Sequence, residues 1–354
     1  MNVSFFYIFF IIVSIVCSFF SSNWLLLWLW LELSSLCLIP IISKVSNLRS
    51  IESTIKYYIF QALGSVILLF GILIRCFFLN EFMIFGNYNI FVSFFIVLGL
   101  SIKIGIFPLH FWFIDVVSGL KFYEGAFVVI ISKVIPLYLL MVVGSFSNSS
   151  IYWVEGMISV VVGSFFGLSQ IQLRKLIGLS SVAHLGWLII LFPYLSLWIS
   201  GFLFLVYVVM SFPLFVIGSL YSSEHFFKVK NVWNNFSFSF IFCISILSLA
   251  GFPPLVGFFY KWIMLYFLVI NDGYVTVAIL IILSLISLYF YLNLFFTLVS
   301  LSWPNLKFLL SSSYYYGNLK EKVFFVFFVF VNLLIFFLML YVGPLNVEFI
   351  FPYN

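Results

Sequence analysis

The sequence consists mainly of apolar runs about 20 residues long, and short stretches between them carry the charged and turn-forming residues. A helix needs about 20 apolar residues to cross the hydrocarbon core of a bilayer. Hydrophobic residues make up 65% of the 354-residue chain and charged residues only 7%, which is too little polar surface to cover a soluble globule. Intrinsic disorder is excluded, because disordered chains are poor in apolar residues. We therefore expect an all-α polytopic membrane protein.

The apolar runs predict about eleven transmembrane helices. Their approximate bounds are 3–20, 24–43, 56–77, 89–118, 122–143, 153–169, 175–193, 196–221, 236–270, 274–300 and 323–343. Two runs, 89–118 and 236–270, are too long for one straight helix, and each contains Gly and Pro near its middle. We expect both to be broken helices. The first run lacks a preceding basic region and a following A-x-A cleavage site, so we expect a span and not a signal peptide.

The basic residues are unevenly divided between the two predicted sides of the membrane. If the spans alternate in direction, the side that carries the N-terminus holds 11 of the 15 Lys and Arg residues, whereas the opposite side holds only Arg75. The 11 residues are Lys44, Arg49, Lys56, Lys121, Arg174, Lys175, Lys228, Lys230, Lys307, Lys320 and Lys322. Cytoplasmic or matrix loops are enriched in Lys and Arg. The N-terminus is therefore expected on the cytoplasmic or matrix side, and the C-terminus on the opposite side.

A weak internal repeat links the two overlong runs. Residues 105–113 (GIFPLHFWF) and 251–259 (GFPPLVGFF) share Gly, Pro, Leu and the final Phe at a constant offset. The two segments are five predicted spans apart, and repeats separated by an odd number of spans have opposite topology. We expect one membrane domain over 1–354, with inverted repeats in 1–143 and 153–300 and with a loop and a C-terminal helix in 301–354.

Four ionisable residues lie well inside apolar runs: Glu32, Lys103, Lys133 and Lys261. Insertion of each at a helix centre costs about 2.5–3.5 kcal/mol. A lysine removed from water releases its proton more readily, and a nearby carboxylate restores the charged form. Glu32 is the only acid deep in a predicted span, so it is the expected partner of one lysine. These four residues are candidates for proton translocation. The alternative is that they form buried ion pairs that hold helices together.

Two histidines are further candidates for a proton relay. His110 follows Pro108 at the first expected helix break, where it either relays protons or caps the freed backbone through a hydrogen bond. His184 lies near Ser180, Ser181 and Trp187 in the run 175–193, and a buried histidine without a partner is costly. We also expect Asp115 and Glu124, which flank the end of the run 89–118, to lie at the membrane interface.

Motifs of soluble enzymes are absent from the sequence. It contains no phosphate loop, no GxGxxG, no metal-spaced His/Cys set and no nucleophile elbow. No pattern typical of flavin, haem or iron–sulfur ligation occurs either. The net charge of +5 is small and dispersed, which argues against nucleic-acid binding. We therefore expect no metal and no cofactor in this chain.

Five segments between residues 24 and 300 form an ordered pattern. They are WLWLELSSLCLIPII (28–42), ESTIKYYIFQALGS (52–65), SIKIGIFPLHFWFIDVVSGL (101–120), QLRKLIGLSSVAHLGW (172–187) and LSLAGFPPLVGFFYKW (247–262). In this order they resemble the subunit 2 family of the mitochondrial NADH:ubiquinone oxidoreductases, respiratory complex I. The resemblance is to the short animal-type form, and it implies an antiporter-like bundle of two inverted five-helix repeats. It also implies a role as one proton-pumping module of the membrane arm.

The resemblance extends to the four ionisable residues. Glu32 falls on the family's helix glutamate, and Lys103 falls on the lysine before the PxHFW break. Lys133 falls on the lysine of a K-x-x-P setting, and Lys261 falls on the lysine after the G-x-P-P-L-x-G-F segment. The chain departs from the family at 114–116, which here is Ile-Asp-Val, where family members often have PEV.

The resemblance also implies a location and partners. It places the chain in the mitochondrial inner membrane, with the N-terminus in the matrix and the C-terminus in the intermembrane space. NADH, FMN, iron–sulfur clusters and ubiquinone would be bound by partner subunits, and other membrane-arm subunits and lipids would surround this chain. Quinone reduction elsewhere would drive protons between Lys103, Lys133 and Lys261, with Glu32–Lys103 as a switchable ion pair. A free-standing cation/proton antiporter and a structural membrane anchor are the two alternatives.

Overall fold

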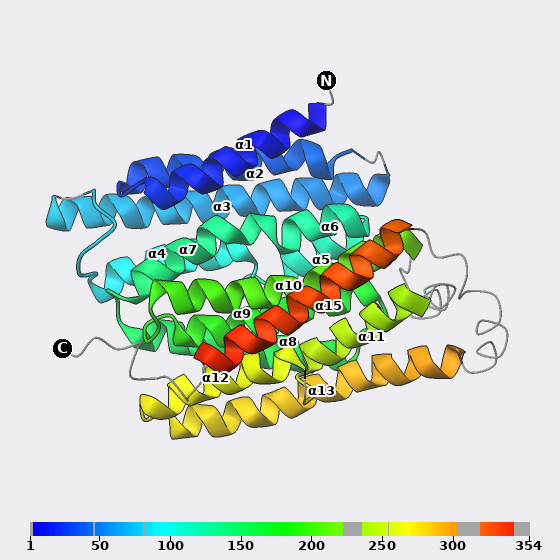
Figure 1. Cartoon of the computed structure of the whole chain (residues 1–354). Coiled ribbons are helices and arrows are strands. Elements are labelled where there is room, and N and C mark those ends of the chain that lie inside the picture. The colour runs from blue at the N-terminus through cyan, green and yellow to red at the C-terminus, as the bar shows by residue number, and fades with distance from the viewer. Residues whose placement is uncertain are drawn as a thin grey trace. The chain divides into compact units, whose positions relative to one another are not determined.

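The computed structural model describes residues 3–44, 47–80, 82–221, 236–253, 255–302 and 319–342. These residues form α-helices joined by turns, one 3-10 segment and an isolated bridge between Asn23 and Met83 (Figure 1). The expected all-α architecture is confirmed. Lys228, Lys230 and Lys307, which entered the topology prediction, lie outside the described residues.

The chain forms two compact units. The first contains Met1–Gly163 and Gly178–Gly201, and the second contains Ser164–Ile177 and Phe202–Asn354. The expected inverted repeats divide the chain at another place, between 143 and 153, and their inverted relation stays a prediction.

The first unit begins with three helices that lie side by side, α1 (Val3–Phe20), α2 (Trp24–Ile42) and α3 (Leu48–Leu79) (Figure 1). Helix α3 packs along α4 (Ile90–Ile104) and α5 (Phe111–Gly119). The chain continues through α6 (Phe122–Val129), a 3-10 turn η1 (Ile131–Lys133) and α7 (Val134–Gly144). Parts of α8 (Ser149–Leu168), α9 (Leu173–Leu191) and the start of α10 (Leu197–Tyr221) complete this unit.

The second unit contains the remainder of α10 and the helices that follow it. These are α11 (Phe236–Ala250), α12 (Val256–Ile270), α13 (Tyr274–Ser302) and α15 (Leu319–Val342). Helix α11 packs against α12, α13 and α15.

Both expected helix breaks are confirmed. Helix α4 ends before Gly105 and α11 ends before Gly251, and these two glycines have φ angles of +79° and +82°. This left-handed conformation carries no steric cost for glycine, which is the residue that most often ends a helix in it. A Cβ atom on Gly105 would also lie 2.5 Å from Cβ of Phe113. The glycines that the internal repeat aligns therefore have the same local role in each unit.

One predicted bound is wrong, and one predicted span has an irregular interior. Helix α3 begins at Leu48 and not near 56. The apolar run does not include its first two turns, because these turns carry charged residues. Glu52 and Lys56 form an ion pair of 2.8 Å one turn apart, and both side chains are exposed. The run 122–143 agrees with the apolar stretch Phe122–Gly144, but the 3-10 turn Ile131–Lys133 interrupts its α-helix. A continuous apolar run carries no signal for such an interruption.

Seven helical stretches in the described part of the chain are long and apolar enough to cross a membrane. They are Trp24–Ile42, Leu48–Phe78, Phe122–Gly144, Ser149–Leu168, Leu173–Leu191, Leu197–Leu220 and Tyr274–Thr297. The remaining predicted spans are the first helix, the two broken helices and the last helix, whose apolar segments are shorter. The chain is therefore a multi-pass membrane protein, and the count of eleven crossings stays a prediction.

Charged residues gather at one end of the first unit. Lys56 forms an ion pair of 3.0 Å with Asp115 of α5, and the Asp115 side chain is 52% exposed. A Cβ atom on Gly119 would lie 3.1 Å from the carbonyl oxygen of Arg49, so the end of α5 touches the start of α3. Arg75 is on the same helix as Arg49, and at a rise of 1.5 Å per residue the two are about 39 Å apart along α3. This separation agrees with the predicted charge asymmetry within the unit.

Arg75 is buried and organises the segment that follows α3. Its guanidinium group donates hydrogen bonds to the carbonyl oxygen of Met83, to that of Phe85 at 3.1 Å and to the hydroxyl of Tyr88 at 2.8 Å. The group also lies 4.0 Å from the centre of the Tyr88 ring. One buried cation therefore binds several groups of a segment that contains little regular structure.

Substitution of Arg75 by lysine will loosen this segment. A lysine keeps the charge but lacks the planar fork that reaches several acceptors, and each lost hydrogen bond to a charged group costs about 1.5–3 kcal/mol. We expect faster proteolysis within 82–88 in Arg75→Lys and a smaller effect in Tyr88→Phe, which removes a single hydroxyl. Protease resistance of Arg75→Lys equal to that of the unmodified protein would contradict this role.

Candidate functional site

Glu32 and Lys103 form an ion pair in the first unit. The Nζ atom of Lys103 lies 2.7 Å from Oε1 of Glu32. The Lys103 side chain is 1% exposed and that of Glu32 is 22% exposed, so Glu32 is the less buried partner. Of the three lysine candidates, the structure thus selects Lys103 as the partner of Glu32.

The position of Lys103 follows from the helix break. Lys103 lies in the last turn of α4, where the negative end of the helix dipole favours a cation. The break also leaves backbone carbonyl groups without helical partners. The side-chain amide of Gln61 on α3 donates to the carbonyl of Lys103 at 2.9 Å. Three helices, α2, α3 and α4, therefore contribute groups to this part of the site.

Lys133 is fully buried at the 3-10 turn between α6 and α7. Its Nζ atom donates to the hydroxyl of Ser181 on α9 at 3.1 Å and lies 3.8 Å from the centre of the Phe113 ring. The Ser181 hydroxyl donates in turn to the carbonyl of Gly178 at 2.7 Å. Within the described residues, no carboxylate lies at ion-pair distance from Lys133. The amine is thus held by a hydroxyl and an aromatic face, not by a counter-charge.

Lys261 lies at the second helix break, within the second unit. Its Nζ atom donates to the carbonyl of Ala250, the last residue of α11, at 2.9 Å and to the hydroxyl of Ser287 at 3.5 Å. The side chain passes over Gly251, where an added Cβ would lie 3.1 Å from Nζ. Each unit therefore places one lysine at the carboxyl end of a broken helix.

The two histidines occupy different places in the first unit. His110 is buried, directly precedes α5, and its ring centre lies 3.9 Å from that of Phe111. His184 is buried on α9, three residues after Ser181, so both side chains are on one face of that helix. The structure thus brings His184 next to the serine that binds Lys133, and it leaves His110 at the helix break.

Comparison with known proteins gives the family. The model of the transmembrane family "NADH:quinone oxidoreductase/Mrp antiporter" matches residues 21–287, more than half of the chain. NADH-ubiquinone oxidoreductase chain 2 of Pisaster ochraceus is 37% identical over 318 residues, which cover 87% of this chain and 88% of that protein. This chain belongs to the NADH-ubiquinone oxidoreductase chain 2 family. The resemblance found in the five sequence segments is confirmed.

Solved structures share the fold of this chain 2 family member. A chain of respiratory complex I from Thermus thermophilus has a TM-score of 0.71 at 23% identity, and the match covers 78% of this chain and 66% of that one. A chain of the Mrp complex from Dietzia sp. has a TM-score of 0.73 at 14% identity, over 81% and 59%. At such identities the likeness concerns the fold alone. The antiporter-like architecture expected from the sequence is thereby confirmed.

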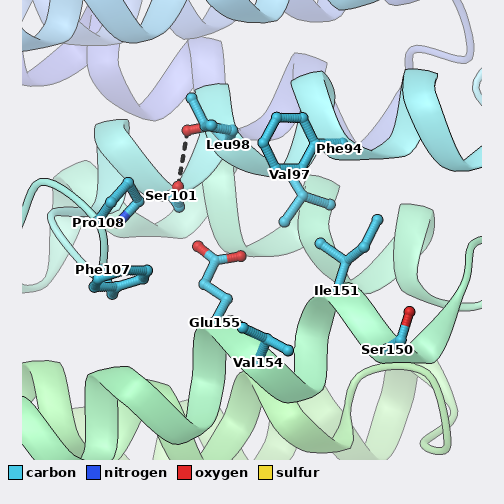
Figure 2. A pocket seen from close by; sticks show the side chains of 10 residues that line it. All are labelled: Phe94, Val97, Leu98, Ser101, Phe107, Pro108, Ser150, Ile151, Val154 and Glu155. Atoms are coloured by element: carbon cyan, nitrogen blue, oxygen red, sulfur yellow. Dashed lines mark hydrogen bonds between the residues drawn. The ribbon is translucent and has the colours of Figure 1, made fainter.

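One buried acid of this chain 2 sequence did not enter the sequence prediction. Glu155 on α8 is 7% exposed, and it lines a cavity of the first unit together with Ser101 (Figure 2). Its position near the start of an apolar run is typical of an acid at the membrane interface. Only the packing of α8 shows that the side chain is buried. The other acid near a helix start, Glu124, is also buried, and it accepts a hydrogen bond of 3.4 Å from the backbone of Lys121.

Proposed function

We propose that this chain is a proton-translocating core subunit in the membrane arm of NADH:ubiquinone oxidoreductase of the mitochondrial inner membrane. The observation that carries the proposal is the ion pair of Glu32 and Lys103 at the end of a broken helix. In this proposal the N-terminus faces the matrix and the C-terminus faces the intermembrane space. The chain acts as part of an NADH:ubiquinone reductase and has no redox centre of its own.

The redox chemistry belongs to partner subunits in this proposal. They bind NADH, FMN, the iron–sulfur clusters and ubiquinone, while this chain contacts other membrane-arm subunits and lipids and no nucleic acid. Its contribution is to hold and release protons at Lys103, Lys133 and Lys261 when quinone reduction elsewhere disturbs the electrostatic balance of the membrane arm.

The ion pair of Glu32 and Lys103 is the switch of the first unit. While the pair is closed, the carboxylate stabilises the ammonium form of Lys103. When the pair opens, Lys103 loses its counter-charge, and an N–H bond breaks as its proton passes to water ordered by the freed backbone of the break. Lys133, which a hydroxyl and an aromatic ring surround, takes up a proton without a competing carboxylate. Ser181 and His184 then continue the path along α9.

The energy needed to move a proton across the membrane is comparable to the energy of a buried ion pair. Moving one charge against about 150–200 mV costs roughly 3.5–4.5 kcal/mol. Breaking a buried ion pair by removal of one partner costs about 3–5 kcal/mol. Opening and closing of one such pair is therefore sufficient to drive one proton against that potential.

Lys261 performs the corresponding proton exchange in the second unit, and its replacement tests the proposal. We expect Lys261→Met to lower the number of protons translocated per electron by the assembled complex. We also expect Lys261→Arg to lower it, because arginine preserves the positive charge at the end of α11 but does not release its proton. The measurement is proton uptake by vesicles that contain the complex, with NADH oxidation followed in parallel.

The arginine variant separates proton transfer from structural support. If Lys261 only neutralises the carboxyl end of α11, Lys261→Arg will translocate protons normally, and the proposed role of Lys261 will be wrong. A matched control is Ser287→Ala, which removes the hydroxyl 3.5 Å from Nζ and leaves the lysine in place. It should change the proton-to-electron ratio less than either lysine variant.

A free-standing cation/proton antiporter is the second candidate, supported by the shared fold with the Mrp complex chain. It predicts ion-gradient transport by the isolated chain in vesicles. The main proposal predicts instead that the chain co-purifies with NADH:ubiquinone reductase activity. A purely structural anchor would also co-purify, but substitution of its lysines would leave the proton-to-electron ratio unchanged.

A further inference from the structure

A cavity of about 430 Å³ lies in the first unit beside the first helix break. Phe107 and Pro108 of the break line it at one end, and Ser150, in the first turn of α8, lines it at the other (Figure 2). Glu155 is five residues after Ser150, about 7.5 Å farther along the helix. The cavity therefore extends from the start of α8 past a carboxyl group to the break between α4 and α5.

Glu155 is the unusual group of this cavity. Its side chain is more than nine-tenths buried, and among the described residues its Oε1 atom has no hydrogen-bond partner. It also forms none of the ion pairs found in the described part of the chain. Apart from Ser101 and Ser150, the side chains that line the cavity are apolar. An ionised carboxylate in such surroundings is far more costly than a neutral carboxylic acid.

The hydroxyl of Ser101 is a further polar group in the wall of this cavity. This hydroxyl lies on the side of the cavity toward which the carboxyl group of Glu155 points in Figure 2. Its single hydrogen is already donated to the carbonyl of Leu98, since the two oxygens are 2.8 Å apart and a carbonyl has no hydrogen to give. Toward Glu155, Ser101 can only accept. A hydrogen bond to this hydroxyl oxygen is therefore possible only for the protonated form of Glu155.

We propose that Glu155 is a proton-binding carboxyl group that exchanges its proton, through the cavity, between the helix break and the end of the unit at which α8 begins. On release, the O–H bond of the carboxyl group breaks and the proton passes to a water molecule, which becomes hydronium. On loading, the same bond re-forms and hydronium returns to water. The assignment rests on the proposed proton-translocating function and adds a fifth proton-binding side chain to Glu32, Lys103, Lys133 and Lys261.

The cavity can hold the water that this exchange needs. A buried water molecule needs two to four polar partners, and the two carboxyl oxygens of Glu155 with the hydroxyl of Ser101 supply them at its polar wall. The rest of the wall is mostly apolar, so Glu155 and Ser101 are where water in the cavity finds its polar partners. Phe107 and Pro108, which also line the cavity, belong to the break itself.

Labelling with dicyclohexylcarbodiimide tests the protonation of Glu155 in the assembled complex in its native membrane. This apolar reagent adds to a protonated carboxyl group, which transfers its proton to the carbodiimide and leaves a stable acylurea on the side chain. We expect mass spectrometry to find the adduct on Glu155. Glu32, ion-paired with Lys103, and Glu52, exposed and paired with Lys56, are internal controls and should remain unmodified.

The same labelling separates a proton from a metal cation. Sodium ions should not protect Glu155, and protection by sodium would overturn the proposal in favour of a cation site. Absence of the adduct from Glu155 would overturn it as well. The experiment uses the unmodified protein, so it does not depend on whether a variant folds. If Glu155 is unmodified while a Lys103 variant stops translocation, this inference fails and the proposed function stands.

A variant then tests proton exchange directly. Glu155→Gln keeps the shape of the side chain, but its amide neither releases nor takes up a proton as the carboxyl group does. We therefore expect loss of the adduct together with a lower proton-to-electron ratio. Glu52→Gln, at an exposed acid, is the matched control and should change neither. A normal ratio in an assembled Glu155→Gln complex would show that Glu155 is only a buried neutral acid, and it would overturn the exchange.

Discussion

Replacement of Lys103 with methionine will stop proton translocation by this subunit while the complex still assembles. Methionine fills nearly the same volume, and it removes the ammonium group that lies 2.7 Å from Glu32. The remaining carboxylate is less buried than the lysine, with 22% of the side chain exposed against 1%. We expect a lower proton-to-electron ratio in vesicles, with NADH oxidation continuing.

Replacement of Glu32 with glutamine will have a different and more severe effect on stability. It leaves the charge of Lys103, which is 1% exposed, without its counter-ion. Breaking a buried pair in this way costs about 3–5 kcal/mol, and we expect less assembled complex. The double variant Glu32→Gln/Lys103→Met should regain assembly but not translocation, because neither charge is left unpaired. Blue-native electrophoresis measures the amount of assembled complex, and acidification of vesicles measures proton translocation.

Two outcomes would contradict the switch. The first is an unchanged proton-to-electron ratio in assembled Lys103→Met. The second is a double variant that assembles as poorly as Glu32→Gln alone, which would mean that the uncompensated charge does not explain the loss. Comparison of the unmodified protein, the two single variants and the double variant therefore separates the electrostatic support of the fold from the transfer of protons.

Replacement of Gly257 with alanine will prevent the second unit from forming its native helix break. Gly257 lies in the first turn of α12, where an added Cβ would come 1.6 Å from the carbonyl oxygen of Ser248 and 2.6 Å from its carbon. Both atoms belong to the backbone of α11, so no side-chain rotation relieves the clash. Helices α11 and α12 must move apart, which breaks the hydrogen bond from Lys261 to the carbonyl of Ala250. We expect the chain to be nearly absent from the assembled complex.

Gly201 is the matched control for this substitution. It lies within α10, and an added Cβ would meet no atom within 4 Å. Alanine is about 1 kcal/mol more favourable than glycine in a helix interior, so Gly201→Ala should assemble at least as well as the unmodified chain. Equal assembly of Gly257→Ala and Gly201→Ala would show that the two helices are not in close contact at Ser248.

Most of the candidate site was visible in the sequence because a charge within an apolar run is costly and rare. Glu32, Lys103, Lys133 and Lys261 were selected in this way, and the structure places Glu32 beside Lys103. The two helix breaks were visible for a related reason, since Gly and Pro interrupt apolar runs that are too long for one span. Both signals come from the local sequence, so they can be recognised without knowledge of the packing.

Other features were not visible because they depend on neighbours distant in sequence. The position of Glu155 near the start of an apolar run resembles that of an interfacial acid, and only the packing of α8 in the first unit shows that the group is buried. Likewise, the 3-10 turn at Lys133 lies within an uninterrupted apolar run. Ser181 and Phe113, which hold that lysine, are far from it along the chain.

The sequence by itself determined that this protein is a multi-pass membrane bundle with two broken helices and a few buried charges. These properties follow from the free energy of transfer between water and lipid, which depends on residue type and order along the chain. Only the tertiary structure decided which charges are paired. It leaves Lys133 with a hydroxyl and a ring, and Lys261 with a helix end. Electrostatic energy depends on distance and burial, and only packing sets both.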